Sequence, residues 1–262
     1  MSLTNQPKAL FFDVFGTLVD WRTPITNALT TASAKALNTR PDSIPKSTQT
    51  QAKQTNWASF AQEWRTSYMV FTSSFDPAHG TFTTVDEHHH TSLKTLLETH
   101  NLQNLFTEPE LQTLSLQWHF LTPWPDSPAG MAQLNQRFTT STLSNGNTAL
   151  LTDLAHHASL PFHHLLGAED FKAYKPAPAV YRGAAERLGL RPDECAMVAT
   201  HISDLACARK NGLQTVYVER KGEASGEDGI EEVERARREG WVDMWVAEGQ
   251  GGLLEVARRF RG

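Results

Sequence analysis

The chain has 262 residues, enough for one large domain or two modest ones with a full hydrophobic core. Its net charge of −5 at pH 7, without basic residues clustered on any predicted face, argues against nucleic acid or an anionic membrane surface as a partner. No apolar run approaches the roughly 18 residues of a membrane span, and the N-terminus has no signal-peptide pattern, so we expect a cytoplasmic protein. The two cysteines, Cys195 and Cys207, fit small buried residues of a reducing compartment.

The first predicted element is a short buried strand that delivers a carboxylate to a glycine turn. Residues 9–12 are apolar, and Asp13 follows them directly, just ahead of Gly16-Thr17. Ligands bind at strand ends of this kind in open α/β sheets, so Asp13 is the candidate nucleophile, with Thr17 beside it. Phe15 stands two places after Asp13. A phenyl ring cannot protonate a leaving alkoxide, but a halide leaving group needs no proton.

Helical spacing replaces the strand pattern over residues 21–121. The polar stretch 38–55 predicts a loop or a weak helix, and residues 76–80 break the pattern. The block contains no convincing strand, so we expect a helical domain, 21–121, inserted between the two parts of an α/β domain, 1–20 and 122–262. Its helices are predicted at residues 24–37, 57–75, 85–98 and 108–121.

Strand and helix patterns alternate again beyond residue 122. Ser127 is the expected N-cap of a helix in which Pro128 takes the first position. Repeated strand–helix–strand units imply a parallel sheet with right-handed crossovers, so the predicted fold class is α/β. Strands are expected at residues 138–143, 164–167, 195–199, 215–218 and 243–247, and further helices at 148–158, 176–188, 205–211, 231–238 and 253–260.

Polar residues follow the later strands as Asp13 follows the first. Ser144-Asn145 ends one strand, although such a pair is by itself only a turn signal. Lys175 precedes Pro176, which is expected to start a helix. A lysine there would neutralise the repulsion between Asp13 and an anionic substrate.

A metal site is not expected from the acidic and histidine residues. The strand at 195–199 is followed by His201 and by a single acid, Asp204, and Phe15 supplies no oxygen, so a hard-cation site is short of ligands. His201 can orient a water or act as a base, and packing alone would also account for it. His88–His90 point in different directions on a helix and cannot chelate one ion well, so a solvated or interface helix is expected.

Taken in order, these segments resemble the four motifs of the haloacid dehalogenase superfamily. The Ser144-Asn145-Gly146 form specifically resembles that of the type II, or L-2-haloacid, dehalogenases. Phosphatases of the superfamily carry a second aspartate at the place of Phe15, whereas these dehalogenases work without a metal. The resemblance therefore implies a Rossmann-like parallel-sheet core of the haloacid dehalogenase type with an inserted helical cap, and no cofactor.

Residue roles follow from the resemblance. Trp64-Arg65 matches a Trp-Arg pair on the second cap helix, whose arginine binds halide or carboxylate. The relatives carry a serine and an asparagine at the places of Ala199 and His201, so this chain departs from the pattern there. The resemblance implies catalytic roles for Asp13, Thr17, Ser144, Lys175, His201 and Asp204, and substrate or halide binding by Phe15, Arg65, Asn145 and Tyr181.

The expected function is that of a hydrolase acting on carbon–halide bonds. Asp13 would displace halide from a short 2-halocarboxylate and form an aspartyl ester, which water opens to give a 2-hydroxy acid. One alternative is a small-molecule phosphatase of the same superfamily that depends on magnesium. Another is a non-catalytic binding protein on this scaffold, because fold does not fix function. A small anionic substrate is the expected partner, and the sequence leaves a homodimer open.

Overall fold

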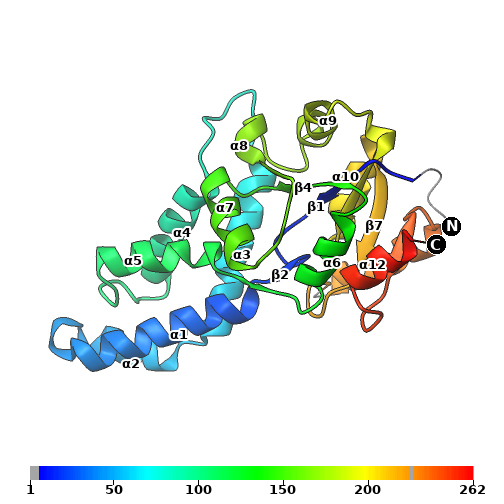
Figure 1. The fold of residues 1–262 in the computed structure, drawn as a ribbon. Coiled ribbons are helices and arrows are strands. Elements are labelled where there is room, and N and C mark those ends of the chain that lie inside the picture. The colour runs from blue at the N-terminus through cyan, green and yellow to red at the C-terminus, as the bar shows by residue number, and fades with distance from the viewer. Residues whose placement is uncertain (1–5, 225–226, 262) are drawn as a thin grey trace. The chain divides into compact units, whose positions relative to one another are not determined.

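The structure of the protein, a computed structural model, describes residues 6–224 and 227–261 (Figure 1). The chain divides into two compact units. Residues 1–20 and 122–262 form the first, which we call the sheet unit, and residues 21–121 form the second, which we call the helical unit. Among the described residues, every helix is too short or too polar to span a membrane.

The sheet unit is built on six parallel strands in the order β5-β4-β1-β6-β7-β8. Strands β1, β6 and β7 are buried throughout, as expected of a parallel sheet covered on both faces. The α/β class expected from the sequence is thus confirmed. The strands are β1 (Ala9–Phe12), β4 (Thr139–Ser144), β5 (His164–Gly167), β6 (Cys195–Ala199), β7 (Gln214–Val218) and β8 (Met244–Val246).

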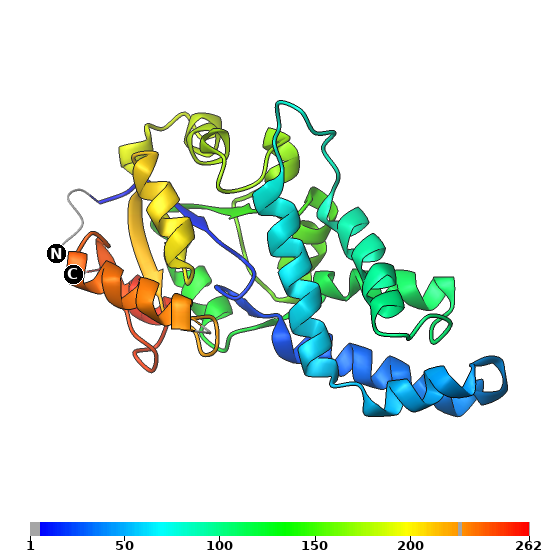
Figure 2. The same cartoon turned by 180° about the vertical axis from the view of Figure 1, so that it is seen from behind.

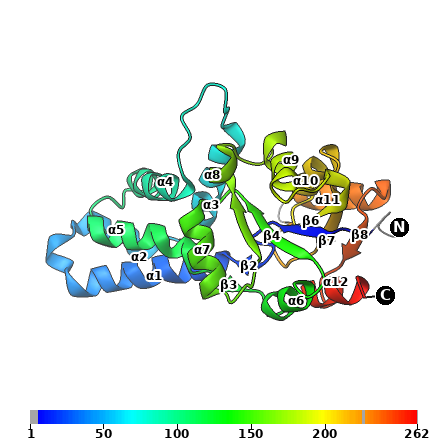
Figure 3. The same cartoon turned by 45° about the horizontal axis from the view of Figure 1, so that its top comes forward.

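Helices cover both faces of this sheet (Figure 3). Helices α9, α10 and α11 lie over one face, where their apolar side chains pack on inward-facing strand residues such as Phe11 and Met197. Helices α6 and α12 lie on the opposite face. The helices of the sheet unit are α6 (Ser127–Leu134), α7 (Thr148–His157), α8 (Ala168–Phe171), α9 (Pro178–Arg187), α10 (Ile202–Lys210), α11 (Glu227–Glu239) and α12 (Leu253–Arg259), with a 3₁₀ turn η3 (Pro192–Glu194).

The strand order creates a topological switch point beside β1. From β1 the chain continues to β4 and β5 on one side, and from β6 it continues to β7 and β8 on the other. Connections on either side of the β1–β6 pair therefore diverge, and in open α/β sheets ligands bind at the carboxyl ends of strands at such a point. A two-residue antiparallel ribbon, β2 (Val19–Asp20) with β3 (Thr122–Pro123), lies where the chain leaves and re-enters the sheet unit. The sequence did not predict this ribbon.

Four expected helix starts in the sheet unit are wrong: α10 begins at Ile202 instead of 205 and α11 at Glu227 instead of 231, and two others are wrong by one or two residues. The N-cap of α6 is Asp126 and not Ser127, and its carboxylate is held by Arg220 instead of capping its own helix. Helix α9 begins at Pro178 and not at Pro176. The residue before a proline is held in an extended conformation, so Ala177, with ψ of 130°, cannot belong to the helix.

The helical unit contains no strand among its residues, as expected (Figure 2). Helix α3 packs against both α1 and α4, and α4 packs against α5. The N-cap Asn56 accepts hydrogen bonds from the backbone N–H groups of Ala58 and Ser59, which explains where α3 begins. The helices are α1 (Arg22–Thr39), α2 (Lys46–Gln54), α3 (Trp57–Ser74), α4 (Val85–Thr99) and α5 (Glu108–Ser115), with 3₁₀ turns η1 (Pro41–Ser43) and η2 (Leu116–His119).

The polar stretch at residues 38–55 is mostly helical, and the histidine run at His88–His90 is partly buried. Residues 38–55 form the end of α1, η1 and the helix α2. The expectation of a solvated or interface helix is wrong for His89, which is 1% exposed and stacks on Trp118 with ring centroids 4.5 Å apart. Trp64 meets the same histidine edge-on. The aromatic cluster excludes water there, while His90 next to it pairs with Glu108 at 2.9 Å.

Helices α6 and α12 approach so closely at Gly130 that a side chain has no room. A Cβ atom on Gly130 would lie 2.4 Å from the Cβ of Leu253 and 2.8 Å from its carbonyl carbon. We expect Gly130→Ala to destabilise the fold by ~1–3 kcal/mol, because α12 must shift. Gly229→Ala in α11 is the matched control: its nearest atom is 3.5 Å away, so the change should be neutral or stabilising by up to ~1 kcal/mol. Urea unfolding of both variants measures the difference, and equal stabilities would contradict the close approach.

Candidate active site

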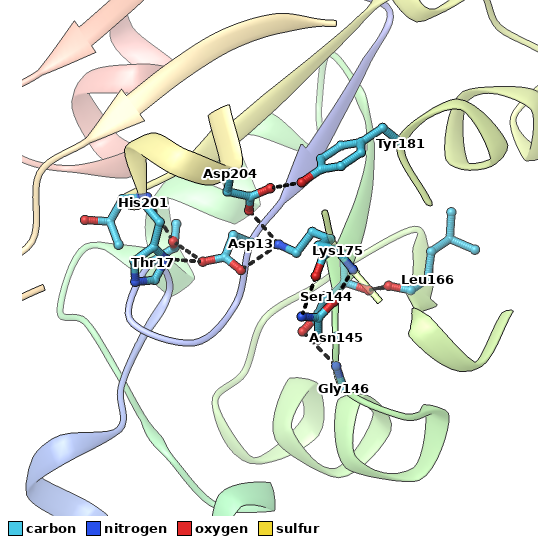
Figure 4. A network of polar contacts seen from close by, with 12 residues as sticks. Asp13, Thr17, Ser144, Asn145, Gly146, Leu166, Lys175, Tyr181, His201 and Asp204 are labelled. Atoms are coloured by element: carbon cyan, nitrogen blue, oxygen red, sulfur yellow. Dashed lines mark hydrogen bonds and ion pairs between the residues drawn. The ribbon is translucent and has the colours of Figure 1, made fainter. Parts of the chain in front are cut away.

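Polar side chains gather at the carboxyl ends of the central strands of the sheet unit (Figure 4). Asp13 directly follows β1, Ser144 ends β4, and His201 and Asp204 follow β6. Lys175 comes from the loop between α8 and α9 and reaches the same place. This edge is also the topological switch point, where open α/β sheets bind their ligands.

The carboxylate of Asp13 is buried and receives several hydrogen bonds. Its Oδ1 accepts from Lys175 Nζ at 2.9 Å, and its Oδ2 accepts from Thr17 Oγ1 at 2.7 Å. The same Oδ2 lies 3.1 Å from Nδ1 of His201. Burial raises the pKa of Asp13, but the Lys175 charge and the bonds from His201 and Thr17 outweigh it and hold the pKa well below its usual range. Asp13 is therefore ionised, as a carboxylate nucleophile must be.

Lys175 bridges two carboxylates. Its Nζ donates to Asp13 at 2.9 Å and to Asp204 Oδ2 at 2.5 Å. Burial lowers the pKa of Lys175, but the two carboxylates raise it further, so the amine stays charged. The hydroxyl of Tyr181 donates to the other oxygen of Asp204 at 2.7 Å. Burial, together with the neighbouring Asp13 charge, raises the pKa of Asp204 against the opposing effect of Lys175.

The turn after β4 holds the main chain of Lys175. Asn145 Oδ1 accepts from the Lys175 N–H at 2.7 Å, and its amide nitrogen donates to the Lys175 carbonyl at 3.5 Å. The buried hydroxyl of Ser144 accepts from the N–H of Gly146 at 3.2 Å and so shapes the turn. The carboxamide NH₂ has two hydrogens, so Asn145 can still donate to a ligand.

His201 lies between two carboxylates, of which the sequence predicted only one. Its Nδ1 faces Asp13, and its Nε2 lies 3.3 Å from Oε2 of Glu223. Burial lowers the pKa of His201, but Asp13 and Glu223 outweigh it and raise the pKa to about 9. Glu223 comes from the turn after β7, which ends at the same edge as β1 and β6. The strand-end rule applied to β7 would have directed attention to this turn.

Two more residues that the sequence did not single out contact Thr17. The N–H of Thr200 donates to Oγ1 of Thr17 at 3.0 Å, and the guanidinium of Arg220 donates to its carbonyl at 2.8 Å. The Thr17 hydroxyl therefore accepts from one neighbour while it donates to Asp13. Phe15 is buried beside this loop, where its backbone forms a bridge with Val19.

Arg65 belongs to the helical unit. It lies on α3 and is 7% exposed, although it is charged. Its guanidinium packs over the rings of Tyr68, at 4.6 Å, and Trp21, at 5.6 Å. Aromatic faces stabilise a cation that has lost part of its water, which offsets the burial of the guanidinium.

The donor set at the sheet edge does not suit a magnesium ion. Both carboxylates, of Asp13 and Asp204, already bond Lys175 Nζ, and the side chain of Phe15 provides no oxygen. Within residues 6–224 and 227–261, no three His, Cys, Asp or Glu side chains are grouped so that they could hold a metal ion. The cation at this site is an ammonium supplied by the chain itself.

Residues 7–212 match the family model of the haloacid dehalogenase-like hydrolases. The chain belongs to this family. The resemblance seen in the motifs is thereby confirmed, and the core is that of a haloacid dehalogenase-like hydrolase.

Several of the similar proteins are 2-haloacid dehalogenases. (S)-2-haloacid dehalogenase 4A of Burkholderia cepacia is 34% identical over 105 residues, which cover 39% of this chain and 46% of that protein. The chain thus matches about half the length of such curated relatives. The crystal structure of a defluorinating L-2-haloacid dehalogenase is 29% identical, with a TM-score of 0.81, and covers 99% of this chain and 97% of its own. A second L-2-haloacid dehalogenase structure is 32% identical, with a TM-score of 0.74, and the match covers 97% of this chain and 99% of that protein's chain.

The raised pKa of His201 predicts how the stability of this haloacid dehalogenase-like hydrolase depends on pH. The folded pKa, about 9, lies above the ordinary value of 6.5, so the imidazolium stabilises the fold fully below pH 6.5. That contribution is lost as the pH rises through about 9, and the free energy of unfolding should fall over this window. Urea unfolding in pH steps checks this against His201→Asn, which cannot titrate. Parallel pH curves for the two proteins would contradict the assignment.

Proposed function

We propose that the protein is a hydrolytic L-2-haloacid dehalogenase that acts on short 2-halocarboxylates. The observation that carries the proposal is the pairing of one ionised carboxylate, Asp13, with Lys175, while Phe15 takes the place of a second acid. This arrangement provides a nucleophile and a positive charge for an anionic substrate, and no carboxylic acid two places after the nucleophile. The activities of the similar proteins support the same reaction.

In the proposed first step Asp13 attacks the carbon that bears the halogen. The Asp13 oxygen forms a bond to carbon 2 of the substrate as the carbon–halogen bond breaks, and the halide leaves with the electron pair. Lys175 offsets the repulsion between two anions, and Thr17 orients the attacking carboxylate. Water then attacks the ester carbonyl of Asp13, and the carboxylate is restored as the 2-hydroxy acid leaves.

The remaining site residues support these two steps in the proposal. Asn145 and Ser144 hold the main chain of Lys175, and Tyr181 and Asp204 hold its ammonium group, through the contacts described above. Since both Asp204 oxygens already accept hydrogen bonds, we assign the activation of water to His201.

Substrate recognition is proposed to involve the helical unit, acting as a cap. Arg65 carries a shielded guanidinium, which suits the planar carboxylate of the substrate or the departing halide. Phe15, Asn145 and Tyr181 are proposed to line the binding pocket. We propose no cofactor, and the free thiols of Cys195 and Cys207 agree with a cytoplasmic location.

The main alternative is a magnesium-dependent phosphatase, and two observations count against it. A phosphate ester leaves as an alkoxide that needs a proton, and Phe15 cannot supply one. The side-chain oxygens available to magnesium at this edge are those of Asp13 and Asp204, and both carboxylates already bond Lys175.

The carboxylate of Asp13 should be indispensable. We expect the parent protein to release halide from L-2-chloropropionate in the presence of EDTA, and Asp13→Asn to lose ~1000-fold or more in kcat while remaining folded. Asparagine keeps the shape of the side chain but is a poor nucleophile. Halide release is measured by ion chromatography, with the D-enantiomer and p-nitrophenyl phosphate plus magnesium as comparison substrates. Halide release by Asp13→Asn within tenfold of the parent would refute the nucleophile, and magnesium-dependent phosphate release would support the phosphatase.

The origin of the new hydroxyl oxygen tests the ester directly. In a single turnover with enzyme in excess and water labelled with oxygen-18, the first 2-hydroxy acid should contain unlabelled oxygen, because that oxygen comes from Asp13. The label should appear in the peptide that contains Asp13, and the L-substrate should give the D-product, since attack occurs opposite the halide. Mass spectrometry of product and peptide provides the measurement. A labelled hydroxyl group in the first product would mean direct attack by water.

A further inference from the structure

Glu223 is a buried acid outside the four motifs, and it contacts His201 and lies against the loop after β1. Its side chain is 7% exposed, and its Oε2 lies 3.3 Å from Nε2 of His201. His201 is 29% exposed and presents its other ring nitrogen to Asp13 at 3.1 Å. The three side chains therefore form a row: carboxylate, imidazole, carboxylate.

The turn that carries Glu223 is anchored, so this contact is built into the fold. Arg220 is 8% exposed and donates to both carboxylate oxygens of Asp126, at 2.6 and 2.8 Å. It also donates to the carbonyl of Thr17, next to the nucleophile loop. The N–H of Glu223 in turn donates to the Arg220 carbonyl at 3.2 Å. A bidentate guanidinium pair of this kind fixes both distance and orientation.

The loop after β1 leaves room for the Glu223 carboxylate. Gly16 has φ of +81°, a conformation that other residues adopt only with strain. A Cβ atom at Gly16 would clash with Oε2 of Glu223. The carboxylate therefore fills the space that a side chain at position 16 would need.

The row determines which nitrogen of His201 can accept a proton. A neutral imidazole has one N–H and one lone pair. A carboxylate only accepts, so once Asp13 has become a neutral ester, Glu223 is the charged acceptor that keeps the hydrogen on Nε2, and the lone pair falls on Nδ1, which faces Asp13. Two charged groups, Asp13 and Glu223, contact the ring, and both favour the imidazolium in the free protein.

We propose that Glu223 is a positioning residue that prepares His201 as the general base for hydrolysis of the Asp13 ester. The inference rests on the proposed dehalogenase function and extends it. When Asp13 becomes an ester it loses its negative charge, so His201 loses one of the two charges that hold its second proton. The Nδ1 proton passes to solvent, and together with the departed halide it accounts for the acid formed in the overall reaction.

Hydrolysis of the ester then restores the starting state. Water gives one proton to Nδ1 of His201 while its oxygen bonds to the ester carbonyl carbon of Asp13. The tetrahedral intermediate expels the substrate oxygen, and its remaining hydroxyl proton passes to that oxygen to give the 2-hydroxy acid. Asp13 is again a carboxylate beside a protonated His201, and Glu223 has held the ring throughout.

A comparison of two charge-removing variants tests the proposal. Glu223→Gln keeps the size of the side chain and removes its charge. Glu219→Gln is the matched control, because Glu219 lies on the same segment and accepts a hydrogen bond from the N–H of Glu248. With enzyme in excess over L-2-chloropropionate, the halide burst of Glu223→Gln should stay within about threefold of the parent. Ester hydrolysis should slow by about tenfold to a hundredfold, so that intact-protein mass spectrometry detects the accumulated ester. Glu219→Gln should match the parent in both steps.

A titration without substrate separates this inference from the proposed function. NMR of the ring of His201 should give a pKa of about 9 in the parent and a lower pKa in Glu223→Gln. Glu223→Asp keeps the charge and should restore part of both the pKa and the rate of ester hydrolysis, whereas a packing role would not depend on charge. Parent-like hydrolysis and an unchanged His201 pKa in Glu223→Gln would overturn the role of Glu223. If the parent released no halide while the His201 pKa still depended on Glu223, the dehalogenase function would fail and the pairing would stand.

Discussion

The burial of one carboxylate, that of Asp13, is the constraint on which the polar edge of the sheet depends. A desolvated charge is costly unless opposite charge and hydrogen bonds compensate it. Lys175 and His201 provide that compensation, but each of them is removed from water in turn and needs a second anion. Asp204 serves Lys175, and Glu223 serves His201. The network therefore extends over the ends of several strands, and the loss of one member leaves another charge unpaired.

The parts of the site that could be predicted are those encoded locally. Asp13 and Asp204 each stand soon after an apolar run and Ser144 ends a predicted strand, and parallel strands end at one edge, so their meeting follows from the pattern. Glu223 does not share this property. The position of Glu223 depends on the hydrogen bond that Arg220 donates to the carbonyl of Thr17 in the loop after β1. These two residues are 203 positions apart in the chain. Such a pairing leaves no periodicity in the sequence.

The errors at helix ends and in the helical unit have the same origin. Ser127 fits the local preference for an N-cap, yet the chain places Asp126 there because Arg220 holds its carboxylate in tertiary structure. His89 stands in a polar run that favours exposure, but Trp64 and Trp118, distant in sequence, bury it. The bounds predicted for long periodic helices lie within a few residues of those in the structure. Periodicity shows which face of an element is covered, but it does not show which distant residue covers that face.

Strand β1 lies at the centre of the sheet, yet it is the first strand to be synthesised. Its neighbours, β4 and β6, begin at Thr139 and Cys195, opposite Ala9 in both pairings. At roughly 5–20 residues per second, a ribosome needs about 6–26 s after residue 9 to reach the first of these, and about 9–37 s to reach the second. Until β4 is made, the apolar segment Ala9–Phe12 has no neighbouring strand of the sheet beside it, while the whole helical unit is completed. A nascent or truncated chain that ends before β4 therefore exposes an unpaired hydrophobic strand, which is the type of segment that aggregates unless a chaperone shields it.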